Sequence, residues 1–409
     1  MKIMHISTIK TQESNKKIFI VLLISLFIFP QELRSVFGEK IYTINILGMV
    51  SLLLLVLNNF REIDKKKLIL LYTTVLIYMC SAIFYENKIT TVITTMTLFI
   101  IPLSLTIIKV DKHTLRDILK WIIWILNSII IVITAIGILE MTFHLNINIA
   151  ISKFMSQRTQ ELMLLNSFMG DNKRLYSFMG HPLFNTQLYL MFFTLNTVYS
   201  KYFKGESLPT WVLIVSVIGI AFTGSKAGFV ILCLAIAALF KSNSRMKKIL
   251  VVACGMIIAF KLGLFDNLIS RFTAGSLTTG RNEKWLEIQS MDLFPIKFFT
   301  GYGRGFTFQF NSYVDWASAA FEYPARMFSL EFGVMVTALI YTFIMVIPTI
   351  ILLARRHYYL FISYLIVFLD VNTFNGLSTT GDKMLIFCLF VFLILNLSNS
   401  MQERELVSD

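Results

Sequence analysis

Charged residues are scarce in this chain of 409 residues. Lysine, arginine, aspartate and glutamate make up 15% of it, whereas hydrophobic residues make up 56% and the mean hydropathy is +0.71. Soluble globular domains carry about 25% charged and 45–50% apolar residues, so the composition excludes that class. Apolar runs of about 20 residues recur along the chain, and that length matches the roughly 30 Å hydrocarbon core of a bilayer. Because no water in that core can satisfy the backbone, each run is expected to be a helix.

Cysteine and intramembrane charge are also rare. The four cysteines fall inside apolar runs without paired spacing, which argues against a disulfide framework and a zinc site. They are Cys80, Cys233, Cys254 and Cys388. Among the carboxylates, Glu140, Glu331 and Asp370 lie near the ends of runs. A proton- or ion-coupled transporter usually carries more charge within its spans, so this scarcity disfavours that class.

The apolar runs predict one polytopic, all-α membrane domain over residues 1–409 with about twelve transmembrane helices. The first run follows Lys16 and Lys17 and has the length of a signal-peptide core, but no small-residue cleavage site follows it. We therefore expect a retained helix. The expected spans are 18–36, 41–60, 68–86, 89–109, 119–142, 184–203, 209–224, 226–241, 249–264, 328–354, 358–371 and 383–399.

The loops between these spans predict the orientation of the chain. Short connections rich in lysine and arginine, such as REIDKKK at 61–67 and KSNSRMKK at 241–248, are typical of the cytoplasmic side. Both termini fall on that side, and the net charge of +13 reflects topology rather than a nucleic-acid partner. Two long loops, 143–183 and 265–327, are expected outside. The second contains Trp285, Ile288 and Met291 at a spacing that predicts a short amphipathic helix.

Three polar motifs lie in the outer segments. They are RLYSFMGHPLFN at 174–185, TGSKAG at 223–228, and a third that runs from TGRNEKW at 279–285 through FFTGYGRGF at 298–306 to FEYPARMFSLEFGVMV at 321–336. Each has a structural interpretation on its own. The glycines suit turns, Lys226 suits a membrane flank, and His181 suits the start of a helix. Arg271 and Arg304 are expected to contact solvent or lipid headgroups.

Taken together, the motifs place cations from separate outer segments near one cavity. Arg174, Lys226 and Arg281 each come from a different motif, and Arg326 follows in the third. Arginine binds phosphate through two parallel hydrogen bonds and lysine acts as a point charge, so the set suits a diphosphate. These cations could stabilise a diphosphate leaving group without a metal. No clustered-acid metal site is evident, and no cofactor is expected.

The order of these motifs resembles the O-antigen ligase and polymerase superfamily of bacterial membrane enzymes. The resemblance rests on Arg174, Gly180, Pro182 and Asn185 opening a span, then TGSKAG, TGR, GYGRG and EFG. It implies a GT-C-like, metal-independent, inverting glycosyltransferase that moves a glycan from undecaprenyl diphosphate on the outer side of the cytoplasmic membrane. It also implies that Arg174 and Arg281 hold the diphosphate. Lys226 stands where many members have arginine, so its role differs at least in geometry.

One departure from the family bears on the reaction. The ligase branch usually has a histidine eleven residues before the glycine of the last motif, and here that position is Glu322. Its absence favours a polymerase over a ligase. The general base is then either Glu322, whose carboxylate could accept the proton of a sugar hydroxyl, or His181.

The sequence therefore predicts a polymerase that joins undecaprenyl-diphosphate-linked repeat units into O-antigen (the glycan of lipopolysaccharide) or capsule. The alternatives are an O-antigen ligase that transfers the glycan to lipid A-core or another acceptor, and a polysaccharide flippase or transporter. Membrane lipids and the carrier-linked glycan are the expected partners. A chain-length regulator and a repeat-unit flippase are partners by family analogy only.

Overall fold

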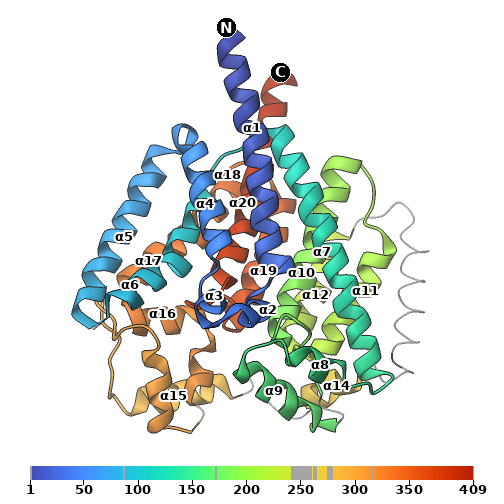
Figure 1. Ribbon diagram of the computed structural model, residues 1–409, viewed down its shortest axis with the longest axis vertical. Coiled ribbons are helices and arrows are strands. Elements are labelled where there is room, and N and C mark those ends of the chain that lie inside the picture. Colours follow the sequence, from blue (N-terminus) through green and yellow to red (C-terminus); the bar gives the residue numbers. More distant parts are fainter. Residues whose placement is uncertain are drawn as a thin grey trace.

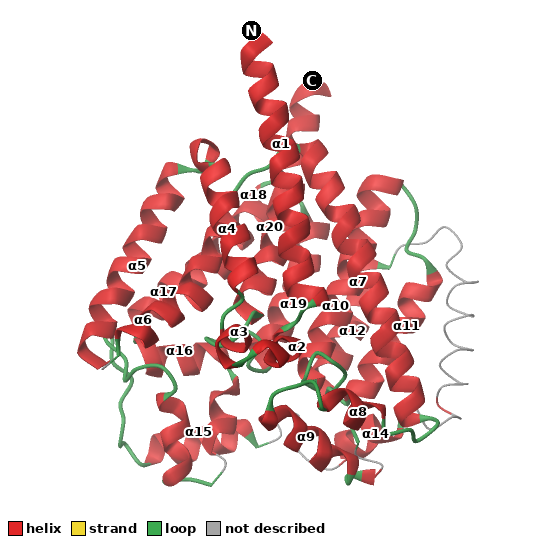
Figure 2. Ribbon diagram, viewed as in Figure 1, coloured by secondary structure: helices red, strands yellow, loops and turns green. Residues whose placement is uncertain are grey.

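The computed structural model describes residues 2–85, 88–170, 173–240, 260, 265–273, 280–315 and 317–408. Throughout these residues the regular elements are helices, and none is a strand (Figure 2). The all-helical, membrane-type architecture predicted from the apolar runs is confirmed at this level. The predicted span at 249–264 lies outside the described residues except for Phe260.

Five helices of the described chain are long and apolar enough to cross a membrane. Two of them pass through short π or 3-10 segments without ending. Three of the five lie in single helices: α5 (Lys65–Tyr85), α7 (Lys112–Met141) and Lys383–Gln402 within α20 (Lys383–Ser408). The fourth is the segment Ile89–Ile107, which begins with α6 (Ile89–Thr95). The fifth is the segment Val334–Ala354, in which a π turn joins α17 (Val334–Tyr341) to α18 (Ile347–Ala354). A sixth is formed if the bent pair Glu13–Ile28 and Gln31–Phe37 counts as one span.

Shorter helices fill most of the remaining predicted spans. They are α4 (Ile46–Asn58), α10 (Pro182–Tyr199), α11 (Thr210–Thr223), α12 (Lys226–Leu239) and α19 (Tyr358–Thr373). The core runs along α20 and α10, since nearly every side chain from Met384 to Leu397 and from Phe184 to Val198 is buried. Helices α7, α11, α12 and α19 pack around these two, and α1 (Lys2–Leu23) contacts α20 through the stacked rings of Phe19 and Phe392.

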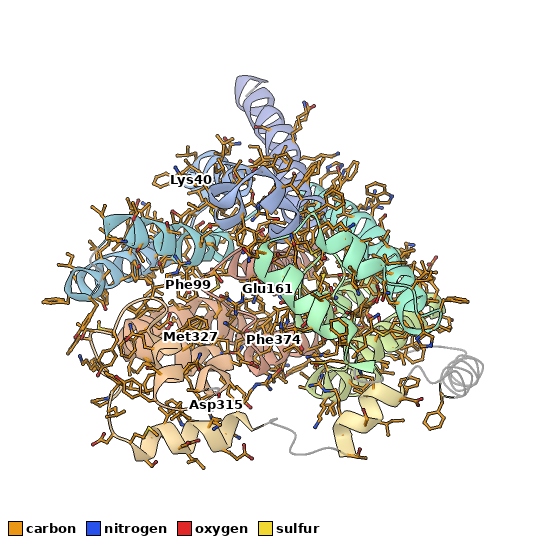
Figure 3. The ribbon with its side chains drawn as sticks, turned by 60° about the horizontal axis from the view of Figure 1, so that its bottom comes forward. Lys40, Phe99, Glu161, Asp315, Met327 and Phe374 are labelled. Carbon is orange, nitrogen blue, oxygen red and sulfur yellow. The ribbon has the colours of Figure 1, made fainter. Side chains whose placement is uncertain are left out.

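The two chain ends and the two long polar loops lie at opposite ends of the molecule. The N- and C-termini emerge side by side, and the helices of both loops gather at the far end (Figure 1). That far end is made by α8 (Ile147–Ser152), α9 (Gln157–Ser167), α14 (Asp266–Thr273), α15 (Arg281–Ser290), 3-10 turns at Phe306–Ser312 and Ala317–Glu322, and α16 (Pro324–Phe332). Figure 3 turns it toward the reader, with Glu161 on the first loop and Asp315 and Met327 on the second.

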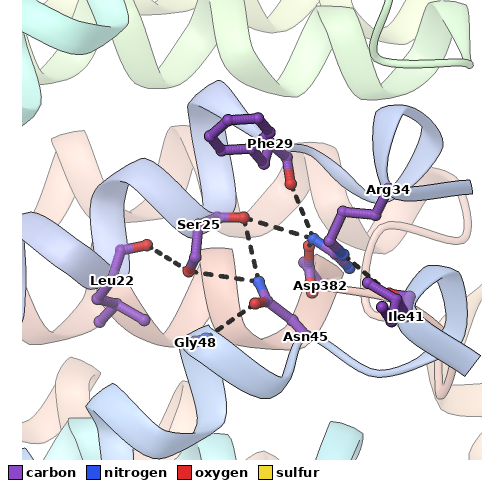
Figure 4. A network of polar contacts seen from close by, with 8 residues as sticks. All are labelled: Leu22, Ser25, Phe29, Arg34, Ile41, Asn45, Gly48 and Asp382. Carbon is purple, nitrogen blue, oxygen red and sulfur yellow. Dashed lines mark hydrogen bonds and ion pairs between the residues drawn. The ribbon is translucent and has the colours of Figure 1, made fainter. Parts of the chain in front are cut away.

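The first predicted span, 18–36, is not one straight helix. The chain bends by 85° between Ile28 and Gln31, where Pro30 cannot donate a backbone hydrogen bond. The carbonyl oxygens freed by the bend are bonded by Arg34 at the end of α2 (Gln31–Arg34). Its Nη1 donates to the carbonyl oxygens of Phe29 at 3.0 Å and Ser25 at 3.4 Å (Figure 4). A buried guanidinium therefore replaces the missing helical hydrogen bonds.

The charge of Arg34 is balanced from the other end of the sequence. Its Nη1 lies 2.6 Å from Oδ2 of Asp382, just before α20, and both side chains are almost fully buried. Nearby, Asn45 donates from Nδ2 to the carbonyl oxygen of Ser25 and caps α4 by accepting from the amide of Gly48. This network fixes the bend against the central helix.

Removing one partner of this pair should destabilise the fold strongly. A lone buried charge costs about 3–5 kcal/mol, so Asp382→Asn should lower the unfolding temperature markedly in detergent. Glu13→Gln is the control, because its ion pair with Lys17 is highly exposed and is expected to contribute little. Equal unfolding temperatures for the two variants would contradict a stabilising role for the Arg34–Asp382 pair.

The predicted span 328–354 is also interrupted. Helix α16 ends at Gly333, with φ of 88°, and α17 starts directly after it. The second loop lies across this break, since the amides of Tyr302 and Gly303 donate to the carbonyl oxygens of Leu330 and Glu331. A Cβ at Gly301 would lie 1.9 Å from the Glu331 carbonyl oxygen, so only glycine permits this approach. The break thereby holds the second loop against the helical core.

Candidate functional site

Backbone contacts fix the segment that precedes α10. The side chain of Asn166 on α9 bonds both the amide and the carbonyl of Arg174, each at 2.9 Å. From the other side, Nδ2 of Asn185 donates to the carbonyl oxygens of Leu175 and Tyr176, each at 2.8 Å. Two asparagines thus satisfy an irregular stretch of backbone, which sets the position of the Arg174 side chain.

Arg174 and Arg271 meet at the end of α11. Nε of Arg174 donates to the carbonyl oxygen of Thr223 at 2.8 Å, where the negative end of the helix favours a cation. Arg271, on α14, packs against Gly224, the residue that follows Thr223. Its Nη1 lies 3.3 Å from the position that a Cβ of Gly224 would occupy. Gly224 has a φ of 61°, which favours glycine at this turn. The TGSKAG turn is therefore the common support of two arginines.

These two guanidinium groups keep unused donors. Nη2 of Arg174 and Nη1 of Arg271 are buried and have no hydrogen-bond partner within the described chain. Burial, together with the positive charges of Arg271 and Arg281, lowers the pKa of Arg174 to about 9, while Glu322 opposes this shift. Burial and Arg281 also lower the pKa of Arg271. Both groups remain charged at neutral pH, so an anion placed among them would relieve their repulsion.

The third arginine is paired with the candidate base. Arg281 starts α15, and its Nε lies 2.7 Å from Oε2 of Glu322. Its Nη2 binds the same oxygen, which leaves Oε1 outside the pair. The side chains are 17% and 33% exposed, so solvent or a ligand can reach them. The structure thus pairs Arg281 with Glu322, two of the residues predicted for the site, and Arg174 lies within electrostatic range of both.

His181 caps a helix. Its Nδ1 accepts a hydrogen bond from the amide of Leu183 at 3.2 Å, at the N-terminus of α10. Burial lowers the pKa of His181 to about 3, and the charges of Lys383, Arg174 and Arg158 contribute. An imidazole with so low a pKa is a weak proton acceptor at neutral pH. These observations favour a capping role over that of a general base.

The two remaining predicted cations lie in other settings. Lys226 is buried in the first turn of α12, after Ser225, which caps that helix by accepting from the amide of Gly228. Arg326 donates to Asn282 and stacks between the rings of Trp285 and Tyr323, at 5.0 and 4.5 Å from their centres. Arg326 thereby ties α15 to α16, and its contacts indicate a positioning role.

Two residues at the site were not assigned there from the sequence. Arg271 was expected to contact solvent or lipid, yet it lies against Gly224 with Asn267, which is one helical turn earlier and donates to the Lys173 carbonyl oxygen at 2.5 Å. The four-residue spacing of Asn267 and Arg271 was the available signal. Lys383 donates to the carbonyl oxygen of Asn375 and acts electrostatically on His181.

The described residues contain no group of three histidine, cysteine, aspartate or glutamate side chains that could hold a metal ion. Comparison with protein-family models, curated proteins and solved structures finds no match to this chain.

Proposed function

We propose that this protein is a polysaccharide polymerase that joins undecaprenyl-diphosphate-linked repeat units on the outer face of the bacterial cytoplasmic membrane. One observation carries the proposal. Arg174, Arg271 and Arg281 come from three segments and repel one another, and Arg281 is paired with Glu322 at the end of the molecule that holds both long loops. A diphosphate would neutralise such a group, and arginine is the residue best suited to bind it.

In the proposed reaction, a hydroxyl oxygen of the acceptor sugar attacks the anomeric carbon of the donor glycan. The bond from that carbon to the diphosphate oxygen breaks, and its electron pair stays on the diphosphate. Guanidinium groups fixed around the leaving group stabilise the charge that develops there. The hydroxyl proton passes to the Glu322 carboxylate. The products are a longer glycan on the acceptor's carrier and free undecaprenyl diphosphate.

The Arg281–Glu322 pair suggests how donor binding and base activation could be linked. A diphosphate that binds Arg281 competes with Glu322 for the same guanidinium nitrogens. Displacement would free Oε2 of Glu322 while the charge of Arg281 stays neutralised. Without a bound diphosphate, Oε2 of Glu322 would stay bonded to Arg281 and would not be available as a proton acceptor.

The proposed topology has twelve spans with GT-C-like architecture. It counts the five long helices, the bent first pair, the five shorter helices and the region 249–264. The termini would be cytoplasmic, since the basic connections accompany them. The long loops would be outside.

The ligase remains the closest alternative because it would use the same donor. The polymerase and the ligase would both need the arginines to bind the donor diphosphate, and the two reactions differ only in the acceptor. Glu322, in place of the histidine usual in that branch, favours the polymerase. A transporter would typically contain matched pairs of broken helices at the midplane of the membrane, and its two states would not require three arginines and an ion-paired carboxylate in the outer loops.

Deletion of the gene and electrophoresis of the surface glycan test the proposal. A polymerase predicts loss of the long-chain ladder, with a single repeat unit still reaching the surface. Polymer that accumulates on the undecaprenyl carrier would indicate a ligase instead. An unchanged ladder would contradict both enzyme functions.

A further inference from the structure

A cavity lies between α15, the segment that follows it and the 3-10 turn that ends at Glu322. Its volume is about 260 Å³, and aromatic rings from three segments form much of its wall. Trp285 lies one helical turn after Arg281, and Phe321 is the neighbour of Glu322 in the chain. Their rings meet edge to face at 5.9 Å. A ligand that reaches the ion pair could therefore extend into this cavity.

The walls of the cavity are held in place by aromatic packing. Phe294 contacts Phe310 edge to face at 5.2 Å, and Phe310 contacts Phe321 at 5.3 Å. Arg326 covers Trp285 and anchors it to α16. Because each ring is fixed by its neighbours, the cavity needs little rearrangement to accept a ligand.

The exposed part of the cavity lining carries two polar side chains beside apolar ones such as Leu293 and Ile296. The two polar residues, Gln289 and Asp292, line the cavity and are exposed to solvent, so their oxygen atoms are accessible to hydroxyl donors. Asp292 has a φ of 47°, a conformation that is uncommon for residues other than glycine, although aspartate and asparagine tolerate it better than most. The cavity thus combines rigid apolar walls with a carboxylate and an amide at its edge.

This combination selects a class of ligand. The Asp292 carboxylate disfavours a diphosphate, and Arg281 and Arg326 beside the cavity disfavour a cation. A prenyl chain could contact the apolar walls but would form no hydrogen bond with the Gln289 amide or the Asp292 carboxylate. A sugar ring has apolar C–H faces for the aromatic walls and hydroxyl groups for both polar side chains.

We propose that this cavity binds a monosaccharide unit of the acceptor glycan and so presents its hydroxyl group toward Glu322. The assignment of the sugar to the acceptor rests on the proposed function. The binding of a sugar at Trp285 and Asp292 can be measured without any turnover.

The test uses the full-length protein in lipid nanodiscs and oligosaccharides released by mild acid from the surface glycan of the parent strain. Saturation-transfer NMR should detect their binding to the wild type. Trp285→Ala should weaken it on the order of tenfold, the size expected for loss of one aromatic contact. Leu286→Ala is the matched control, because Leu286 is 65% exposed and does not line the cavity. Its affinity should equal that of the wild type.

A second variant covers the case in which Trp285→Ala fails to fold. Asp292→Asn keeps the shape and the backbone conformation but removes the charged acceptor, and it should also weaken binding. Wild-type affinity in both variants, or no binding to the wild type at millimolar oligosaccharide, would overturn the proposal. Displacement of the oligosaccharide by farnesyl diphosphate in the Arg281→Ala protein would assign the cavity to a prenyl chain and would overturn it too.

Failure of this proposal is distinguishable from failure of the polymerase assignment. Arg281→Ala should bind the free oligosaccharide like the wild type, because that probe has no diphosphate. Oligosaccharide binding that depends on Trp285, together with an unchanged ladder in the deletion strain, would support the sugar site and contradict the polymerase. Loss of the ladder in the deletion strain, with no oligosaccharide binding that depends on Trp285, would support the polymerase and contradict the sugar site.

Discussion

Replacing Arg281 with alanine should abolish long-chain glycan while the protein still inserts at normal levels. Arg281 is proposed to bind the leaving diphosphate, and removal of one fixed donor to a developing charge typically costs 10²–10³-fold in rate. A ladder built by successive additions would then collapse to its shortest members. The measurement is the electrophoretic profile of the surface glycan in a deletion strain that carries the variant, with membrane levels followed by immunoblot.

Two further variants make this result interpretable. Arg116→Ala removes an exposed arginine on α7, far in the sequence from every motif of the site, and should leave the ladder unchanged. Arg271→Ala leaves the Arg281–Glu322 ion pair intact and should still shorten the ladder, since Arg271 lies beside Arg174 at Gly224. Wild-type chain lengths from Arg281→Ala at normal membrane levels would remove Arg281 from the site. Wild-type lengths from Arg271→Ala would limit the anion site to Arg174 and Arg281.

The sequence predicted the helices better than it predicted their interruptions. Apolar runs fix where a chain can be helical in a membrane, and α5, α7 and α20 follow them closely. The bend after Ile28 depends on Arg34 meeting Asp382, which is 348 residues away in sequence. The break at Gly333 depends on the loop near Gly301 packing against Glu331. Neither contact is visible in a local pattern of hydropathy, because both arise from tertiary packing.

The candidate site was predictable only where local sequence patterns mark its residues. Arg174 and Arg281 were selected because their motifs are polar stretches at the mouths of apolar runs, and the structure places them within electrostatic reach of each other. Arg271 was missed because one arginine in a short amphipathic helix looks like a solvated or lipid-facing residue. Its partner at the site is the turn at Gly224, which belongs to another segment. His181 was ambiguous in sequence, and its contact with the Leu183 amide favours the capping alternative.

Replacing Glu322 with glutamine should have opposite effects on binding and on turnover. Glutamine keeps the shape of the side chain but cannot form the ion pair with Arg281, so a diphosphate no longer competes with a carboxylate. A part-exposed ion pair contributes roughly 1 kcal/mol or less, so undecaprenyl diphosphate should bind up to about fivefold more tightly. The amide cannot accept the proton of the sugar hydroxyl, so turnover should fall about 10²–10⁴-fold.

Tighter diphosphate binding combined with slower turnover would distinguish a general base from a carboxylate that only forms a structural ion pair. If Glu322 only holds α15 in place, the substitution should weaken diphosphate binding and slow turnover together, and it should lower the unfolding temperature. Titration of nanodisc-embedded protein with undecaprenyl diphosphate measures diphosphate binding. Chain extension with purified carrier-linked repeat units measures turnover. Glu161→Gln is the control, since Glu161 is an exposed carboxylate at the same end of the molecule (Figure 3) and should change neither. Tighter binding with normal turnover would keep the competition for Arg281 and would move the base to another residue.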